Sequence, residues 1–119
     1  TILFVEDETI VLQALSGMIT AQGYKVITAT DGFEAVETFK KMKDEIDLVI
    51  MDIGLPKMSG WDVFTEMKKE KDDVKVIISS GYLDPKIKSE KTLAGIKEFI
   101  QKPYDPNQIL RSVRKVLDT

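Results

Sequence analysis

Side chains able to do chemistry follow the apolar runs of this sequence, at the points where strands would end. Two carboxylates follow the first run, and a carboxylate, a hydroxyl and an ammonium follow the third, fourth and fifth: Glu6, Asp7, Asp52, Ser80 and Lys102. The carboxyl ends of parallel strands meet at one edge of a sheet, and open α/β sheets bind ligands at that edge. We therefore expect these five side chains to share one crevice.

Three carboxylates that share a crevice favour a bound cation. Two like charges 4 Å apart repel by roughly 4 kcal/mol at an effective dielectric constant near 20. Carboxylates in such a position shift their pKa values or take up a cation. An oxygen-only site with an open face suits Mg²⁺, and Mn²⁺ is the alternative ion.

A phosphoryl group is the substrate that fits this set of side chains. A metal-bound carboxylate such as Asp52 is able to attack phosphorus as an anion, which gives an aspartyl phosphate without a general base. Mg²⁺ and the Lys102 ammonium would stabilise the charge on the transferred oxygens, and Ser80 would donate a hydrogen bond to them. The residues therefore predict transfer of a phosphoryl group to Asp52.

Each of these residues also has a simpler structural interpretation. In isolation, Asp52 would be a strand end or a local cap, and Glu6 and Asp7 would mark a solvated helix N-terminus. Ser80 would be a turn residue and Lys102 a surface charge. Their joint position at the ends of the predicted strands favours the chemical interpretation.

Composition excludes several other classes of function. The 119 residues suit one domain, which we expect to cover residues 1–119. The absence of histidine and cysteine excludes Ser–His and Cys–His catalysis, imidazole or thiolate zinc sites, and a phosphohistidine on this chain. A net charge of −3 argues against direct nucleic-acid binding. No apolar run approaches the ~20 residues of a membrane span, and the lack of cysteines fits a reducing, cytoplasmic location.

The apolar spacing predicts alternating strands and helices. Five apolar runs predict strands at residues 2–5, 25–29, 47–52, 74–78 and 98–101. Amphipathic spacing predicts five helices, of which two are short and lie near residues 61–70 and 85–94. This alternation predicts an α/β fold with a single doubly wound, five-stranded parallel sheet and helices on both faces.

Capping signals mark the ends of the predicted helices. They occur at Gly23, Asp31, Ser59, Asp84 and Asp105. Glu34 follows Asp31 as in a capping box, and Pro106 and Gln108 follow Asp105 in the same pattern.

Five short motifs resemble one known family. They are VEDE at 5–8, LVIMD at 48–52, LPKMSG at 55–60, SSG at 79–81 and KP at 102–103. In this order and spacing they resemble the receiver domain of two-component response regulators, over nearly the full length of the chain. The resemblance implies a flavodoxin-like fold with strand order 2-1-3-4-5. The SSGY stretch at 79–82 is similar to receivers attached to sensor histidine kinases, so the receiver of a hybrid kinase is one form of this hypothesis.

The resemblance also implies a role for each acidic residue. Asp52 would be the phosphoacceptor and, together with Asp7, a direct Mg²⁺ ligand. The backbone carbonyl of Gly54 would be the third protein ligand, and Glu6 would act through a water molecule. Glu6 stands where many members of the family have aspartate, so its side chain is longer while its charge is the same.

Signalling roles and partners are implied in the same way. Ser80 would be the switch hydroxyl, Lys102 the lysine that pairs with the phosphoryl group, and Phe99 the aromatic that changes rotamer. The Lys102–Pro103 peptide bond would be cis. A histidine kinase or a histidine phosphotransfer domain would donate the phosphoryl group, and a downstream protein or output domain would bind the face of residues 84–118. Such a domain catalyses its own phosphorylation and dephosphorylation rather than turning over an external substrate.

Three other functions share parts of this pattern. A haloacid-dehalogenase-like phosphohydrolase also uses an aspartate and Mg²⁺, but it has a second acid two residues later, where this chain has Gly54. A flavodoxin-like binder would place glycine and hydroxyl residues after the first strand, where this chain has Glu6, Asp7 and Glu8. A receiver used only for interaction and never phosphorylated would not need the complete acidic, hydroxyl and lysine set.

Overall fold

The computed structural model describes residues 1–55, 57–80, 96–102 and 104–118. The strands within these ranges are β1 (Ile2–Val5), β2 (Val26–Ala29), β3 (Leu48–Asp52), β4 (Val76–Ser80) and β5 (Ile96–Gln101). The helices are α1 (Thr9–Ala21), α2 (Gly32–Met42), α3 (Gly60–Glu70) and α5 (Pro106–Leu117). The helix predicted near residues 85–94, its cap at Asp84 and the peptide bond to Pro103 lie outside the described residues. None of the described helices is long and apolar enough to cross a membrane.

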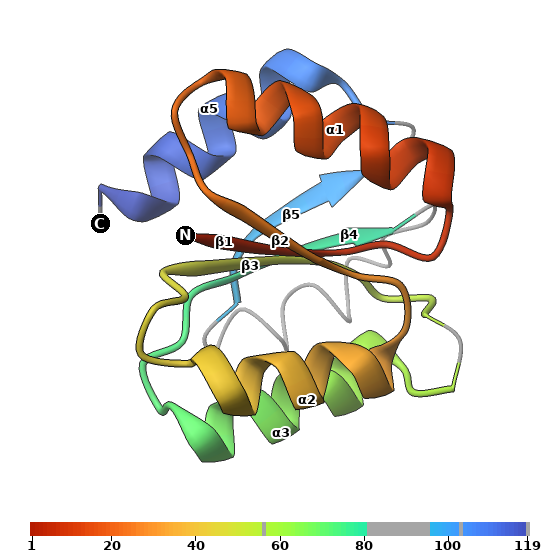
Figure 1. Cartoon of the computed structure of the whole chain (residues 1–119), viewed down its shortest axis with the longest axis vertical. Helices are drawn as coiled ribbons and strands as arrows, with labels where there is room; N and C mark the ends of the chain where they lie inside the picture. The colour runs from red at the N-terminus through yellow and green to blue at the C-terminus, as the bar shows by residue number, and fades with distance from the viewer. Residues whose placement is uncertain (56, 81–95, 103, 119) are drawn as a thin grey trace.

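The five strands form one parallel sheet with the order β2-β1-β3-β4-β5. This order and the doubly wound arrangement confirm the predicted fold class. Helices α1 and α5 cover one face of the sheet, and α2 and α3 cover the other (Figure 1). The strand order reverses direction between β1 and β3, so the crevice at their carboxyl ends is the ligand-binding position of such a sheet.

The core has two layers because every residue of β1, β3 and β4 is buried. Successive side chains of a strand point to opposite faces. In β1, for example, Phe4 packs with the residues of α1 and α5, and Leu3 packs with those of α2 and α3. A strand that is buried on both faces needs apolar residues at every position, which is why these runs are unbroken in the sequence.

Side-chain caps start three of the four described helices. The carboxylate or hydroxyl oxygens of Asp31, Ser59 and Asp105 accept hydrogen bonds from the backbone N–H groups of Glu34, Asp62 and Asn107. All three confirm the predicted N-caps, and Gly23 has the left-handed φ of 97° expected after a helix. The capping box predicted between Asp105 and Gln108 is wrong in its partner, because the N–H one residue earlier makes the bond.

Strand β4 lies two residues further along the chain than the sequence predicts. Ser79 pairs in register with Asp52 and accepts a hydrogen bond from the N–H of Ile53 at 2.9 Å. The carbonyl of Ser80 accepts one from the N–H of Lys102 at 2.7 Å. Both serines therefore belong to the ladder rather than to the loop, which places them level with Asp52 at the edge of the sheet. The other strand boundaries differ from the prediction by no more than two residues.

Candidate functional site

The carboxyl ends of β1 and β3 bring three carboxylates together. One oxygen each of Glu6, Asp7 and Asp52 lies within 4.8 Å of the others. The two strands are direct neighbours, with Val5 opposite Met51, so the residues that follow them must lie side by side. Glu6 is fully buried, Asp52 nearly so, and Asp7 is exposed, which opens the cluster to solvent on one side. The predicted acidic crevice is therefore present.

Lys102 joins this cluster from the other half of the sheet. It follows β5 and reaches across the end of β4 to the cluster, where its Nζ lies 2.8 Å from Asp52 Oδ2 and 3.0 Å from Glu6 Oε2. The ammonium thus offsets part of the repulsion between two of the three carboxylates. This contact confirms that Lys102 and the acidic residues share one site.

Burial and charge have opposite effects on the pKa values of Glu6 and Lys102. Burial raises the pKa of Glu6, while hydrogen bonds from Lys102, the N–H of Glu8 and the hydroxyl of Tyr104 hold it down in part. Burial also works to lower the pKa of Lys102, but hydrogen bonds and charges from Asp52 and Glu6 outweigh it and leave that pKa above its ordinary value. The lysine is therefore firmly cationic at neutral pH.

The loop after β3 fixes the orientation of Asp52. The N–H of Gly54 donates a 3.0 Å hydrogen bond to Asp52 Oδ1, the oxygen that Lys102 does not contact. Gly60 packs so closely on the backbone of Asp52 and Ile53 that a Cβ would lie 2.7 Å from the Ile53 Cα. The sequence motif with glycine at 54 and 60 therefore shapes the site through backbone contacts.

Two hydroxyl residues of the site are absent from the sequence-based prediction. The hydroxyl of Tyr104 donates a 2.9 Å hydrogen bond to Glu6 Oε2 and lies 2.7 Å from Ser79 Oγ. Burial is the main cause that raises the pKa of the Tyr104 phenol well above its ordinary value. The sequence carries only weak signals for them: Tyr104 stands two residues after Lys102, and Ser79 directly precedes Ser80.

Comparison with known proteins decides the family. A family model described as the response regulator receiver domain matches residues 2–114. This chain belongs to the receiver domain family. Receiver domains of two-component systems are phosphoacceptors, and the cluster of Glu6, Asp7 and Asp52 is consistent with Mg²⁺-dependent phosphorylation of an aspartate.

Individual receivers resemble the chain over most of its length. Chemotaxis protein CheY of Thermotoga maritima is 37% identical over 116 residues, which cover 97% of this chain and 95% of that protein. The CheY of Borrelia burgdorferi, solved in a complex with CheX, BeF₃ and Mg²⁺, is 32% identical with a TM-score of 0.91 and coverage of 97% and 87%. Sensor kinase CckA of Brucella abortus is 30% identical over 118 residues, or 99% of this chain and 12% of that protein. Receivers of sensor kinases are thus among the relatives, at lower identity than CheY.

Of the two predicted switch residues of the receiver, Ser80 lies at the edge of the sheet beside the site, and Phe99 lies further back in β5, opposite Ile78. Ser80 is buried at the end of β4, and its backbone is bonded to that of Lys102. Phe99 is half-buried and packs against the core layer of α2 and α3. Their roles in switching remain predictions, as does the use of the Gly54 carbonyl as a metal ligand.

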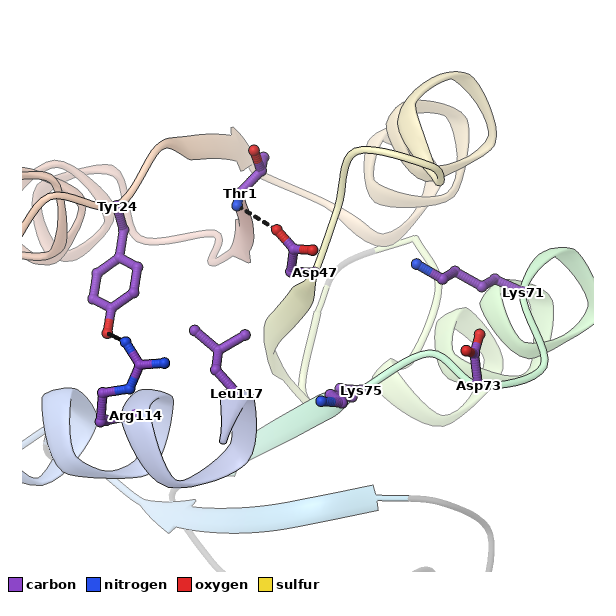
Figure 2. Close-up of a pocket in the computed structure, with 8 residues that line it drawn as sticks. All are labelled: Thr1, Tyr24, Asp47, Lys71, Asp73, Lys75, Arg114 and Leu117. Carbon is purple, nitrogen blue, oxygen red and sulfur yellow. Dashed lines mark hydrogen bonds and ion pairs between the residues drawn. The ribbon is translucent and has the colours of Figure 1, made fainter. Parts of the chain in front are cut away.

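A separate cavity lies at the opposite edge of the receiver sheet (Figure 2). It measures about 460 Å³, and its lining includes Thr1, Asp47 and Lys75, which precede β1, β3 and β4. The amino group of Thr1 lies 2.7 Å from Asp47, and Arg114 donates to the hydroxyl of Tyr24 at 3.2 Å (Figure 2). Charges of both signs line this cavity, and the acidic cluster lies at the other end of the strands.

Proposed function

We propose that Asp52 receives the phosphoryl group, in a Mg²⁺-dependent transfer from a phosphohistidine on another protein or domain. The observation that supports this most is the position of its carboxylate. One oxygen accepts from Lys102 and the other from the N–H of Gly54, while the carboxylates of Glu6 and Asp7 lie beside it. The carboxylate is held in place, and the exposed side of the cluster at Asp7 gives a donor access to it.

The transfer needs only a nucleophile and charge stabilisation. An oxygen of Asp52 attacks phosphorus as an anion, so that a P–O bond forms while the P–N bond to the donor imidazole breaks. The electron pair of the P–N bond returns to the imidazole, which leaves neutral when its other nitrogen is protonated. Lys102 is already 2.8 Å from the attacking group and would pair with an oxygen of the transferred phosphoryl. Ser80 would donate a hydrogen bond to another of these oxygens.

The residues present fit Mg²⁺ as the bound cation. All side-chain donors are carboxylate oxygens, which hard cations prefer, and one side of the cluster is open for water and phosphoryl oxygens. Asp7 and Asp52 would hold the ion directly, with the Gly54 carbonyl as a third ligand and Glu6 through water. When bound, Mg²⁺ neutralises charge on the phosphoryl oxygens. The related CheY of Borrelia burgdorferi was solved with Mg²⁺ and BeF₃, and Mn²⁺ would serve in the same position.

Labelling by phosphoramidate tests this proposal, because phosphoramidate has the same P–N bond as phosphohistidine. We expect one phosphoryl group per chain by intact mass, only when Mg²⁺ is present, and none in Asp52→Asn. Asp47→Asn is the matched control, because Asp47 directly precedes the same strand, β3, at its opposite end. Labelling that survives Asp52→Asn, or that Asp47→Asn also abolishes, would contradict the assignment.

The partners follow from the same chemistry. We propose a histidine kinase or a histidine phosphotransfer domain as donor, and an output protein or domain that binds the face of residues 84–118. Ile10 supports the first proposal, because its side chain is 84% exposed at the start of α1, close to Tyr104 and the site. Ile10 belongs to a mostly apolar groove that also includes Val11, Ala14, Leu15 and Tyr104, and such a groove beside a reactive group offers a contact for a docking protein.

A further inference from the structure

Both oxygens of the fully buried Glu6 carboxylate have hydrogen-bond partners. Oε1 accepts hydrogen bonds from the N–H of Glu8 at 3.3 Å and from Lys102 Nζ at 3.2 Å. Oε2 accepts one from the Tyr104 hydroxyl at 2.9 Å and lies 3.0 Å from Lys102 Nζ. An ionised carboxylate without such partners would be costly to bury. Tyr104 supplies the one uncharged side-chain donor in this set.

The hydrogen bonds between Ser79, Tyr104 and Glu6 have a single direction. An ionised carboxylate accepts only, so the one proton of the Tyr104 hydroxyl points to Glu6. The Ser79 hydroxyl then donates to Tyr104, 2.7 Å away, in preference to its other acceptor, the Met51 carbonyl at 3.5 Å. A directed chain of hydroxyls polarises each of its members and strengthens the last bond. The two linked hydroxyls of Ser79 and Tyr104 therefore hold Oε2 of Glu6 in one place.

Packing holds the Tyr104 ring itself. The ring meets Phe4 of β1 edge to face, with centroids 6.2 Å apart and planes at 77°. Lys102 Nζ lies 5.4 Å from the centroid of the same ring, within cation–π range. One aromatic side chain thus contacts both the anion of Glu6 and the cation that Glu6 shares with Asp52.

The length of the Glu6 side chain explains why the hydrogen bond from Tyr104 matters. Glutamate has one more rotatable bond than the aspartate found here in many receivers, so its carboxylate needs more restraint. Without the Tyr104 hydroxyl, Oε2 would keep only Lys102 as a partner. Glu6 would then draw Lys102 away from Asp52, or turn away from Asp7.

We propose that Tyr104 is a positioning residue for divalent-cation binding, an inference that rests on the proposed function. The hydroxyl chain from Ser79 through Tyr104 fixes the carboxylate of Glu6, so that Glu6 and Asp52 share Lys102 and the three carboxylates stay within reach of one ion. Tyr104 itself contacts neither the ion nor the phosphoryl group. It acts through Glu6.

Mg²⁺ titration tests the inference without any phosphoryl transfer. Binding is followed by calorimetry and by fluorescence of Trp61, the only tryptophan, which follows the Gly60 that packs on the backbone of Asp52. Removing a group that orients a metal-binding side chain typically weakens metal binding. We therefore expect the Kd for Mg²⁺ to be about tenfold higher in Tyr104→Phe. Tyr24→Phe is the matched control, because it removes a hydroxyl bonded to Arg114 at the other edge of the sheet.

Repeating the Tyr104→Phe substitution in a Glu6→Asp variant separates a positioning role of Tyr104 from a general structural role. Glu6→Asp withdraws the carboxylate by one methylene, beyond reach of the Tyr104 hydroxyl. If Tyr104 acts through Glu6, Tyr104→Phe should change the Mg²⁺ Kd by less than about twofold in the Glu6→Asp background. An equal loss in both backgrounds, or no loss in either, would overturn the inference. Failure of the unsubstituted chain to bind Mg²⁺ would instead overturn the proposed function on which it rests.

Discussion

The ammonium of Lys102 lies 2.8 Å from a carboxylate oxygen of Asp52, although the two residues are 50 positions apart in the chain. The same ammonium contacts Glu6, so it offsets negative charge that a divalent cation would also neutralise. Lys102 and an ion bound at the cluster would therefore both act on the carboxylates of Glu6 and Asp52. Stability and ion binding are linked at this site, and substitutions there should change both.

Lys102→Met should destabilise the protein more without Mg²⁺ than with it. Removing one partner of a largely buried charge pair costs about 3 kcal/mol, and an ion bound to the folded state returns part of this loss. The Mg²⁺-dependent rise in Tm should thus be larger in the variant, while phosphoramidate labelling slows at least about tenfold. Thermal unfolding with and without Mg²⁺ measures the first effect. Lys115→Met, which removes an exposed pair with Glu98, should change neither; an equal Mg²⁺ effect in both variants would refute the linkage.

Gly60→Ala should destabilise the loop that holds Asp52. An added Cβ would lie 2.7 Å from the Ile53 Cα and 2.9 Å from the Asp52 carbonyl oxygen, so the backbone must move. We expect a loss of about 1–3 kcal/mol in the free energy of unfolding, with weaker Mg²⁺ binding. Gly17→Ala is the matched control, because a Cβ at this position in α1 meets nothing within 4 Å. There alanine should stabilise by about 0.5–1 kcal/mol, since it favours the helix. Urea titrations that rank the two variants the other way would contradict this account.

Asp31 should give the protein part of its acid sensitivity. The backbone N–H of Glu34, helped by the ammonium of Lys57, holds the pKa of Asp31 below its ordinary value of 3.8. Because the unfolded chain binds this proton more readily, the stabilisation is present above that value and is lost as the pH falls through the lower folded-state pKa. The difference in Tm between the unsubstituted protein and Asp31→Asn should therefore shrink below pH 3.8. Ser59→Ala removes an uncharged cap, and its effect should not vary with pH in this range.

The two adjacent serines at the end of β4 should have different roles. Successive strand residues point to opposite faces, and Ser79 turns its hydroxyl to Tyr104. Ser79→Ala should weaken Mg²⁺ binding in the same direction as Tyr104→Phe, but less. Ser80→Ala should leave Mg²⁺ binding unchanged and slow phosphoramidate labelling by about tenfold, because it removes a donor to the transferred group. If calorimetry showed weaker Mg²⁺ binding in Ser80→Ala, and labelling slowed about tenfold in Ser79→Ala instead, this assignment of roles would be wrong.

Much of the site follows from the sequence because strand ends fix its position. Once alternation gives a parallel sheet, residues that directly follow β1 and β3 must be neighbours, and Glu6, Asp7 and Asp52 need no further information. Lys102 is predicted to join them because it directly follows β5, which ends at the same edge of the sheet. Its side chain is long enough to span the width of β4.

The remaining parts depend on features that sequence patterns do not record. A strand buried on both faces has no polar alternation to mark its ends, so the strand predicted at residues 74–78 stops two residues before β4 does and leaves Ser79 out. Tyr104 follows β5 in an irregular segment, where spacing does not tell which way a side chain turns. Its contact with Glu6 could be found only from the packing of the Tyr104 ring against Phe4 of β1.

Glu6 and Tyr104 meet although 98 positions separate them in the chain. During synthesis, the acceptor aspartate and its two acidic neighbours leave the ribosome well before the lysine and tyrosine that complete the pocket. A nascent receiver therefore has Asp52, the proposed phosphoacceptor, before it has the counter-charge of Lys102, and under the proposed function we expect phosphorylation to wait until β5 has joined the sheet. Phosphorylation of Asp52 would in this way report that all five strands of the sheet are in place.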